Sequence, residues 1–166
     1  MRKYQKVVVA LTVLLLAGGV VRGLYRLGVS VPAMAKLVTQ PTVVIDPGHG
    51  GIDGGAVGID DIVEKEINLA ICLGLRDMFT LSGFDVVMTR DTDRSIHDDG
   101  VTGTRKQKTS DLHNRMAIAE ANSGGVFISL HQNKFGDSSS RGTQVFYGPK
   151  NPESQRLAQL LQGRFV

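Results

Sequence analysis

The chain has 166 residues, 42% of them hydrophobic, so it can form one modest domain with a real core but not two. Its formal net charge of +3 comes from residues 1–40, which hold six basic side chains and no acidic one; residues 41–166 carry 13 basic and 16 acidic side chains. A mildly acidic domain argues against nucleic acid as the partner. The single cysteine, Cys72, excludes an internal disulfide framework and a metal cluster of several cysteines.

The first 27 residues have the pattern of an export signal. A basic start is followed by fifteen uncharged residues, Val7 to Val21. We interpret residues 1–27 as a signal peptide or an uncleaved N-terminal membrane anchor, and residues 28–41 as a linker, so that the domain is exported. Ala33-Met34-Ala35 resembles a signal peptidase site but lies well beyond the apolar run, which is shorter than the ~17–25 residues of a spanning helix. A buried core helix is the alternative.

From residue 42 the pattern alternates between strands and helices. Thr42 to Ile45 is a β-branched run that predicts a buried strand ending at Asp46-Pro47, because proline cannot continue a central ladder. Apolar spacing predicts an amphipathic helix from Glu66 to Leu81, and Phe84 to Thr89 predicts a second strand. This βαβ unit predicts the α/β class, with a mostly parallel or mixed twisted sheet flanked by helices.

The second half continues the alternation. Residues 90–108 lack apolar periodicity and predict a long solvated loop. A helix is expected from Ser110, its N-cap, to Asn122, followed by a third strand from Val126 to Leu130. Residues 143–147 predict a fourth strand, and Asn151-Pro152-Glu153 predicts the start of a last helix, with proline in its first turn.

His49 lies in a glycine-rich loop directly after the first predicted strand, at the edge where open α/β sheets place their sites. The run Gly48 to Asp53 nearly matches the dinucleotide-binding pattern GxGxxG, but its last position is an aspartate and no helical pattern begins before about Asp61. A phosphate-binding loop is not supported either, because the sequence contains no Gly-Lys-Ser or Gly-Lys-Thr. Two interpretations remain: a loop that presents an imidazole to a metal ion, and a histidine with a structural role or none.

Possible partners for His49 lie far along the chain. The carboxyl ends of neighbouring parallel strands meet at one edge, so His131, directly after the third predicted strand, can face His49. Glu64 and Glu66 stand where the loop becomes a helix, which brings a carboxylate toward the same edge. Two histidines and one carboxylate leave the fourth tetrahedral position open, as in a hydrolytic zinc site. A carboxylate that only favours the helix dipole is the alternative.

Four segments carry a resemblance to a known family: VVIDPGHGGIDGGAVG, VEKEINLAI, RMAIAEAN and FISLHQNK. In this order and spacing they resemble the zinc-dependent N-acetylmuramoyl-L-alanine amidases of bacterial cell-wall hydrolysis, over roughly residues 42–150. The combination of DPGHGG, Glu-Lys and SLHxN is specific, whereas each piece alone is weaker. Within the family, the leader placed directly before the domain resembles the sporulation-associated CwlD-like group.

The resemblance implies site residues one by one. His49, Glu64 and His131 match the three zinc ligands, so one Zn²⁺ ion per chain is implied and Glu66 is a bystander. Other positions are expected to shape the loop, to hydrogen-bond to the ligands or, for the arginine, to contact a carboxylated substrate. These positions are Asp46, Asp53, Arg115 and Asn133.

The resemblance implies hydrolysis of the amide between N-acetylmuramic acid and L-alanine in peptidoglycan. It implies that this reaction serves spore cortex maturation, through the muramic δ-lactam pathway, and germination. It also implies a protein partner in sporulation. Family members carry a proton-transferring glutamate in a segment not found up to Val166. We therefore expect the catalytic domain, residues 42–166, to be C-terminally incomplete, to bind zinc weakly and to release no stem peptides alone. A catalytically inactive peptidoglycan-binding or regulatory fragment, and an unrelated α/β binding domain whose two histidines never meet, are the other hypotheses.

Overall fold

The computed structural model describes residues 3–26, 41–132 and 142–165. The chain divides into two compact units, residues 1–40 and 41–166. In the first unit, helix α1 spans Lys3–Arg26 and includes the predicted apolar leader. Within the described part of the chain, no helix combines the length and the apolar character needed to cross a membrane. The predicted linker, residues 28–41, falls outside the described residues except for its last position.

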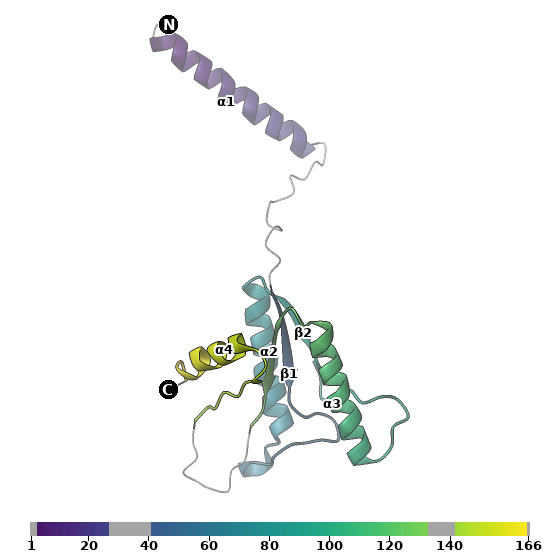
Figure 1. The fold of residues 1–166 in the computed structure, drawn as a ribbon. Coiled ribbons are helices and arrows are strands. Elements are labelled where there is room, and N and C mark those ends of the chain that lie inside the picture. The colour runs from purple at the N-terminus through teal and green to yellow at the C-terminus, as the bar shows by residue number, and fades with distance from the viewer. Residues whose placement is uncertain (1–2, 27–40, 133–141, 166) are drawn as a thin grey trace. The chain divides into compact units, whose positions relative to one another are not determined.

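The second unit is built on three parallel strands, with β1, Thr42–Pro47, in the centre (Figure 1). Strand β2, Asp85–Met88, pairs with one side of β1, and β3, Val126–Leu130, pairs with the other. Helix α2, Glu64–Leu81, leads from β1 toward β2, and α3, Thr104–Ala121, leads from β2 toward β3. This arrangement confirms the predicted α/β class and places the end of β1 between two neighbouring strands.

The core lies between one face of the sheet and α2. Because successive side chains of a strand point to opposite faces, Val43 and Ile45 share a face, and both pack with Cys72 of α2. Cys72 is fully buried, which confirms that it is a small core residue rather than an accessible nucleophile. The partly buried side chains packed around these three are Leu75, Phe79, Phe84, Val86, Met88, Ile128 and Leu130.

Helix α3 lies on the opposite face of the sheet (Figure 1), where its buried Arg115 pairs with Asp46 of β1. The helix begins at Thr104, so the predicted start at Ser110, and its role as N-cap, were wrong. The first turns of α3 are polar on every side and therefore leave no apolar periodicity to detect. Ser110 lies inside the helix, where its hydroxyl donates a hydrogen bond of 2.8 Å to Asp98.

The prediction of a fourth strand at residues 143–147 was wrong, since this segment has no regular structure. Its backbone is hydrogen-bonded by a side chain of α4, Pro152–Gln162, in place of a neighbouring strand. The Gln162 amide donates to the carbonyl oxygen of Thr143 and accepts from the backbone amide of Val145, each at 2.9 Å. A β-branched and aromatic run therefore did not suffice to form a strand, since none of the described strands pairs with this segment.

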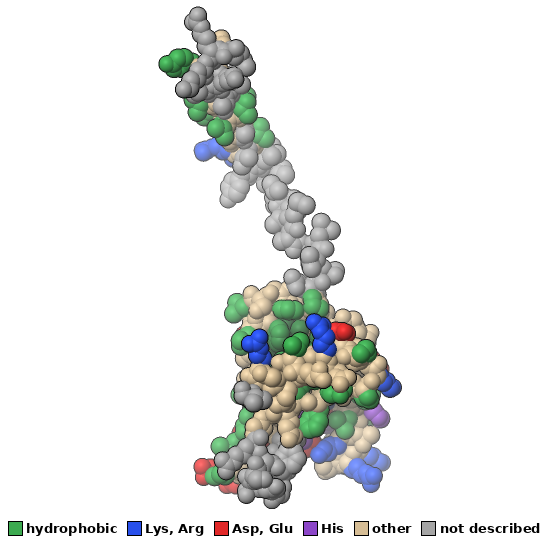
Figure 2. All heavy atoms as spheres, turned by 60° about the vertical axis from the view of Figure 1, so that its left-hand side comes forward, with side chains coloured by type: hydrophobic (Ala, Val, Ile, Leu, Met, Phe, Trp, Pro, Cys, Tyr) green, Lys and Arg blue, Asp and Glu red, His purple; other side chains and the backbone are tan. Residues whose placement is uncertain are grey.

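Helix α4 starts as predicted, with the Asn151 side chain accepting a hydrogen bond from the backbone amide of Glu153. Its apolar side chains are partly exposed, among them Leu160 at 59% and Leu157 at 37%. Figure 2, which brings the α4 side of the domain forward, shows hydrophobic side chains at the surface between Lys and Arg side chains. Helix α4 thus leaves part of its apolar face uncovered by the described residues of the domain.

Candidate metal centre

Three side chains converge at the carboxyl edge of the sheet. His49 follows β1, His131 follows β3, and Glu64 is the first residue of α2. His49 Nε2 lies 3.2 Å from Glu64 Oε1, and His131 Nδ1 lies 3.2 Å from each of these two atoms. The predicted convergence is thus present, and the hypothesis in which the two histidines never meet was wrong.

This triangle of atoms has the size of one face of a tetrahedral zinc site. Ligand atoms bound to zinc at ~2.0–2.1 Å lie about 3.3 Å from one another. The three edges of 3.2 Å match that spacing without rearrangement of the side chains. In the described ranges of the chain, this is the one group of His, Cys, Asp and Glu side chains placed to hold a metal ion.

The hydrogen bond between His49 and Asp53 determines which ring nitrogen of His49 can bind a metal. Asp53 Oδ2 lies 2.9 Å from His49 Nδ1, so the carboxylate accepts the proton of that nitrogen. In the neutral ring, Nε2 then presents a lone pair to the Glu64 carboxylate. Two lone pairs at 3.2 Å repel unless a cation lies between them, so the donor set fits a metal ion.

Lys108 of α3 supports the same contact, with Nζ 3.0 Å from Asp53 Oδ1. Burial works to raise the pKa of Asp53, but the hydrogen bonds from His49 and Lys108 outweigh it, and the pKa lies below its ordinary value. Asp53 therefore stays ionised and able to hold the His49 ring. Lys108 belongs to the stretch that was predicted to be a solvated loop.

Glu64 is 5% exposed, yet it is held as a carboxylate. Burial works to raise its pKa, but the backbone amides of Ala56 and Gln132, each donating at 2.8 Å, lower it further, so the pKa of Glu64 lies below its ordinary value. Asn68, one turn further along α2, donates weaker hydrogen bonds to Glu64 and to the carbonyl oxygen of Gly48. Sequence reasoning missed Asn68, although its spacing of four residues from Glu64 places both on one helix face.

Arg90 braces the backbone that leads to His49. It follows β2, is fully buried, and donates to the carbonyl oxygens of Pro47 at 2.9 Å, Gly48 at 3.0 Å and Lys65 at 2.9 Å. The prediction that residues 90–108 form a solvated loop was therefore wrong at its first position. One buried cation fixes the end of β1 and the first turn of α2 relative to each other.

Arg115 is the second buried guanidinium at this edge. It pairs with Asp46 and with Asp111, and it donates to the carbonyl oxygens of Pro47 at 2.9 Å and His49 at 2.7 Å. We expected Arg115 to contact substrate from the rim; the structure buries it, and its donors are taken up by the protein. Asp46 also accepts hydrogen bonds from the hydroxyl groups of Thr89, directly after β2, and Ser129 in β3; its expected role in shaping the loop stays a prediction.

Two glycines leave the space that the ligands fill. A Cβ atom on Gly48 would overlap the His131 ring, and one on Gly55 would lie 2.6 Å from the His49 ring and 2.7 Å from Glu64 Oε2. His49 itself has a φ of 64°, a left-handed conformation that is uncommon outside glycine. The loop thus places its imidazole by a turn that larger residues at positions 48 and 55 would block.

Lys65, next to the candidate ligand Glu64, ties the glycine loop to the segment after β2. Its Nζ donates to the carbonyl oxygen of Gly51 at 2.9 Å and to Asp93 at 2.6 Å, while Asp93 accepts from the backbone amide of Gly51 at 2.8 Å. Glu66 is exposed, in agreement with the expectation that it is a bystander. The predicted site residue Asn133 lies outside the described residues.

The fold and this site define an α/β domain with a His-Glu-His metal-binding geometry at the carboxyl edge of a parallel sheet. The profile of a family described as N-acetylmuramoyl-L-alanine amidase matches residues 43–166. The chain therefore belongs to the N-acetylmuramoyl-L-alanine amidase family, as the sequence resemblance indicated.

Similar proteins come from several bacteria. The germination-specific N-acetylmuramoyl-L-alanine amidase of Bacillus subtilis (strain 168) is 33% identical over 80% of this chain and 54% of its own length. The amidase AmiA of Escherichia coli (strain K12) is 32% identical over 82% of this chain and 43% of its own length. The chain thus spans about half the length of these curated relatives.

Among solved structures, the CwlD amidase from Clostridioides difficile, determined in complex with the GerS lipoprotein, superposes with a TM-score of 0.71 and 37% identity. The match covers 75% of this chain and 64% of that one. The catalytic domain of CwlV, an N-acetylmuramoyl-L-alanine amidase from Bacillus (Paenibacillus) polymyxa, has a TM-score of 0.58 at 32% identity. These similarities support the fold assignment independently of the site.

Proposed function

We propose that this protein hydrolyses the amide bond between N-acetylmuramic acid and L-alanine in peptidoglycan, with one Zn²⁺ ion held by His49, Glu64 and His131. The observation that carries the proposal is the triangle of 3.2 Å between His49 Nε2, Glu64 Oε1 and His131 Nδ1, in a chain of the amidase family. When bound, zinc supplies a Lewis acid that polarises the scissile carbonyl and lowers the pKa of water.

The chain's own residues prepare this chemistry. Glu64 contributes a carboxylate kept ionised by backbone amides, and Asp53 holds the proton of His49 on Nδ1. Arg90 and Arg115 hold the backbone of Gly48 and His49 by hydrogen bonds to their carbonyl oxygens. The candidate metal ligands therefore need little rearrangement when substrate binds. Protonation of the leaving amine requires a general acid in addition to these residues.

The proposal includes a setting outside the cytoplasm. The basic, apolar leader in residues 1–27 and the position of peptidoglycan both favour export, with the leader as signal peptide or anchor. A role in sporulation and a lipoprotein partner are supported by the germination-specific relative and by the similar amidase solved with a lipoprotein. Fractionation of cells that produce the tagged chain tests export, which a purely cytoplasmic chain would contradict.

The activity is tested on purified sacculi by measuring soluble stem peptides that carry a new alanine amino terminus. Formate is added in a parallel series, because a small carboxylic acid can carry the proton to the leaving amine. We expect no release without formate, and in the formate series we expect release that depends on added zinc and disappears in His49→Ala and His131→Ala. The exposed His113→Ala is the matched control and should retain the activity of the unchanged chain.

Different outcomes separate the hypotheses. Release of reducing sugar ends would identify a glycan-cleaving enzyme instead and overturn the proposal. Sacculus binding with no release in either series would favour the inactive binding fragment. Fast release without formate would contradict the expectation that the chain alone releases no stem peptides, while supporting the proposed amidase activity.

A further inference from the structure

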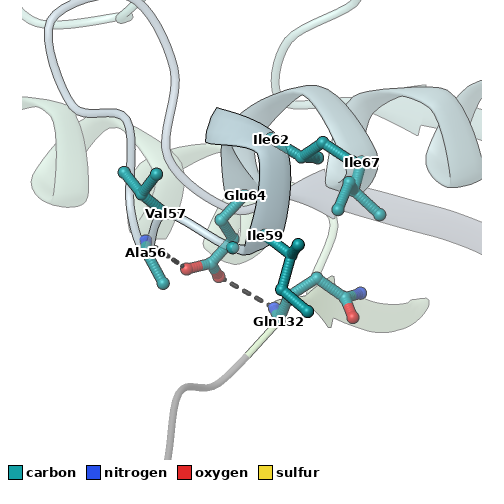
Figure 3. A pocket seen from close by; sticks show the side chains of 8 residues that line it. Ala56, Val57, Ile59, Ile62, Glu64, Ile67 and Gln132 are labelled. Carbon is teal, nitrogen blue, oxygen red and sulfur yellow. Dashed lines mark hydrogen bonds between the residues drawn. The ribbon is translucent and has the colours of Figure 1, made fainter.

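The three candidate metal ligands are held in place by different means. Glu64 is buried and accepts hydrogen bonds of 2.8 Å from the backbone amides of Ala56 and Gln132 (Figure 3). His131 directly follows β3, whose backbone is paired with β1. His49, in contrast, lies in a turn of glycines, so its position depends on what holds that turn.

The turn at His49 has a backbone conformation that glycine permits and most residues avoid. The φ angle is 64° at His49, 139° at Gly50 and 55° at Gly51. Fixing a glycine backbone costs more conformational entropy than fixing any other residue. Backbone hydrogen bonds of 2.9 and 3.1 Å between Gly50 and Asp53 close the turn. Because Asp53 holds the His49 ring, a movement of the turn displaces the candidate ligand.

An ion pair tethers the tip of this turn through Gly51. Lys65 Nζ donates to the carbonyl oxygen of Gly51 at 2.9 Å, and Asp93 Oδ1 accepts from the Gly51 amide at 2.8 Å. Lys65 Nζ and Asp93 Oδ2 pair with each other at 2.6 Å. Both backbone groups of Gly51 are therefore held by one closed set of contacts, from α2 on one side and from the segment after β2 on the other.

The lysine end of the tether is fixed to the domain. The carbonyl oxygen of Lys65 accepts a hydrogen bond of 2.9 Å from the buried Arg90, and its amide donates to the carbonyl oxygen of Gly54 at 3.1 Å. The Lys65 side chain is 17% exposed. Its hydrogen bond holds the pKa of Asp93 below the ordinary value, so Asp93 remains a carboxylate. Lys65 is also the lysine of the Glu-Lys pair, whose glutamate is the candidate ligand Glu64.

We propose that Lys65 and Asp93 act as one positioning pair for His49, which fixes the glycine turn before a metal ion arrives and so raises the affinity for zinc. Neither side chain belongs to the group placed to hold the ion. A site that is in its binding geometry for part of the time binds more weakly by that fraction. This inference rests on the proposed function, because it takes His49 as a zinc ligand.

The charge of the lysine alone predicts the opposite effect. Zinc carries two positive charges, so removal of a nearby cation would strengthen zinc binding, and removal of the Asp93 anion would weaken it. Loss of the tether weakens binding in both cases. The sign of the change in Lys65→Met therefore separates the two explanations, since methionine keeps a long apolar side chain and lacks the ammonium group.

The test measures the dissociation constant of zinc by isothermal titration calorimetry with a competing chelator. We expect Lys65→Met and Asp93→Ala each to weaken zinc binding about tenfold, as is typical for residues that orient metal ligands. The double variant should also bind about tenfold more weakly than the unchanged chain, because either loss already frees the turn. If charge alone acted, the two effects would cancel in the double variant.

The matched controls are Arg76→Met and Asp77→Ala, which break an exposed ion pair on the same helix. Arg76 lies about 16 Å further along α2 than Lys65, so neither control should change the zinc affinity. Asp93 is 46% exposed, so Asp93→Ala tests the pair even if Lys65→Met does not fold.

A second readout needs no metal. Amide order parameters of residues 50–53 are measured by NMR in the metal-free, isotope-labelled chain. They should fall in Lys65→Met and Asp93→Ala and stay unchanged in the two controls, because the tether limits the motion of the turn. Unchanged order parameters in both variants, or an unchanged or stronger zinc affinity in Lys65→Met, would overturn the inference.

These outcomes are separable from those that test the proposed function. Zinc binding that is lost in His49→Ala but unchanged in Lys65→Met would overturn the positioning pair alone. A tenfold loss of affinity in both variants, without stem-peptide release in the formate series, would support the pair and count against the amidase activity. Absence of zinc binding by the unchanged chain would overturn both.

Discussion

The guanidinium of Arg90 donates a hydrogen bond of 3.0 Å to the carbonyl oxygen of Gly48, inside the domain and directly before His49. Arg90 thus connects the end of β2 to the loop that presents a candidate metal ligand. Replacement by alanine would remove the hydrogen bonds to three backbone carbonyl groups and leave the space of a buried guanidinium empty. We expect Arg90→Ala to lower the free energy of unfolding by about 3 kcal/mol, measured by urea denaturation.

The control for Arg90 is Arg94→Ala, in the same segment but with a side chain that is 60% exposed. It should change the free energy of unfolding by less than about 0.5 kcal/mol. Arg90→Lys keeps the charge but not the fork of donors, so it should recover only part of the loss. Equal stability of Arg90→Ala and the unchanged chain would show that the buried guanidinium is not needed to hold the loop.

Gly48 provides a prediction that depends on space rather than charge. A Cβ at this position would overlap the His131 ring, so Gly48→Ala should displace the imidazole and weaken zinc binding about 10- to 100-fold, as measured by isothermal titration calorimetry. Gly124→Ala is the matched control, because a Cβ there meets nothing within 4 Å. An unchanged zinc affinity in Gly48→Ala would mean that His131 is not a ligand in this position.

The reactivity of the Cys72 thiol is expected to report unfolding of the domain. Its burial, followed by the nearby charge of Asp46, raises the pKa of Cys72 to about 11. Because the pKa of Cys72 is higher in the folded than in the unfolded chain, the protonated thiol contributes to the free energy of unfolding. This contribution is complete below the unfolded pKa and is lost as the pH rises through about 11. At pH 8, Ellman's reagent should therefore react only as fast as the domain opens; immediate stoichiometric reaction would contradict the buried position.

The ionised carboxylate of Asp111 is expected to stabilise the domain less in acid than at neutral pH. Burial works to raise its pKa, but hydrogen bonds from Arg115 and from the Ile96 amide lower it below its ordinary value of 3.8. Its stabilising contribution is therefore complete above that ordinary value and is lost as the pH falls below it toward the folded-state pKa. Asp111→Asn should destabilise the domain by about 2 kcal/mol at pH 7 and by clearly less at pH 3.

The comparison for Asp111 is Asp77→Asn, whose side chain is 65% exposed on α2. Its effect should stay below about 0.5 kcal/mol at both pH values, because exposed ion pairs contribute little. The readout is the free energy of unfolding from urea titrations at each pH. A destabilisation by Asp111→Asn that is the same at pH 3 and pH 7 would contradict the assigned ionisation.

Local patterns in the sequence predicted the elements that carry the candidate ligands. The β-branched run before Asp46-Pro47, the apolar spacing of α2 and the run 126–130 each follow one period, and all three elements formed. The convergence of His49 and His131 followed from parallel topology alone. Their exact triangle with Glu64 required the motif resemblance, since an acidic residue at a helix start is common without a metal.

The residues that hold the site were not predictable in the same way. Arg90 and Arg115 are buried cations, and a charged residue in a polar stretch of sequence is normally solvated. Their partners are backbone carbonyl groups of residues 47–49, which have no signature in the sequence. The start of α3 at Thr104 escaped detection for a similar reason, because its first turns have no apolar face.

The central claim is that His49, Glu64 and His131 bind one divalent ion together, and zinc stoichiometry measures it most directly. Metal-free chain is dialysed to equilibrium against an excess of Zn²⁺, and bound zinc is counted by mass spectrometry against the dialysis buffer, for the unchanged chain, His49→Ala, Glu64→Gln, His131→Ala and the control His113→Ala. We predict one zinc per chain in the unchanged chain and the control, and loss of binding in the other three. Full zinc content in both His49→Ala and His131→Ala would contradict it.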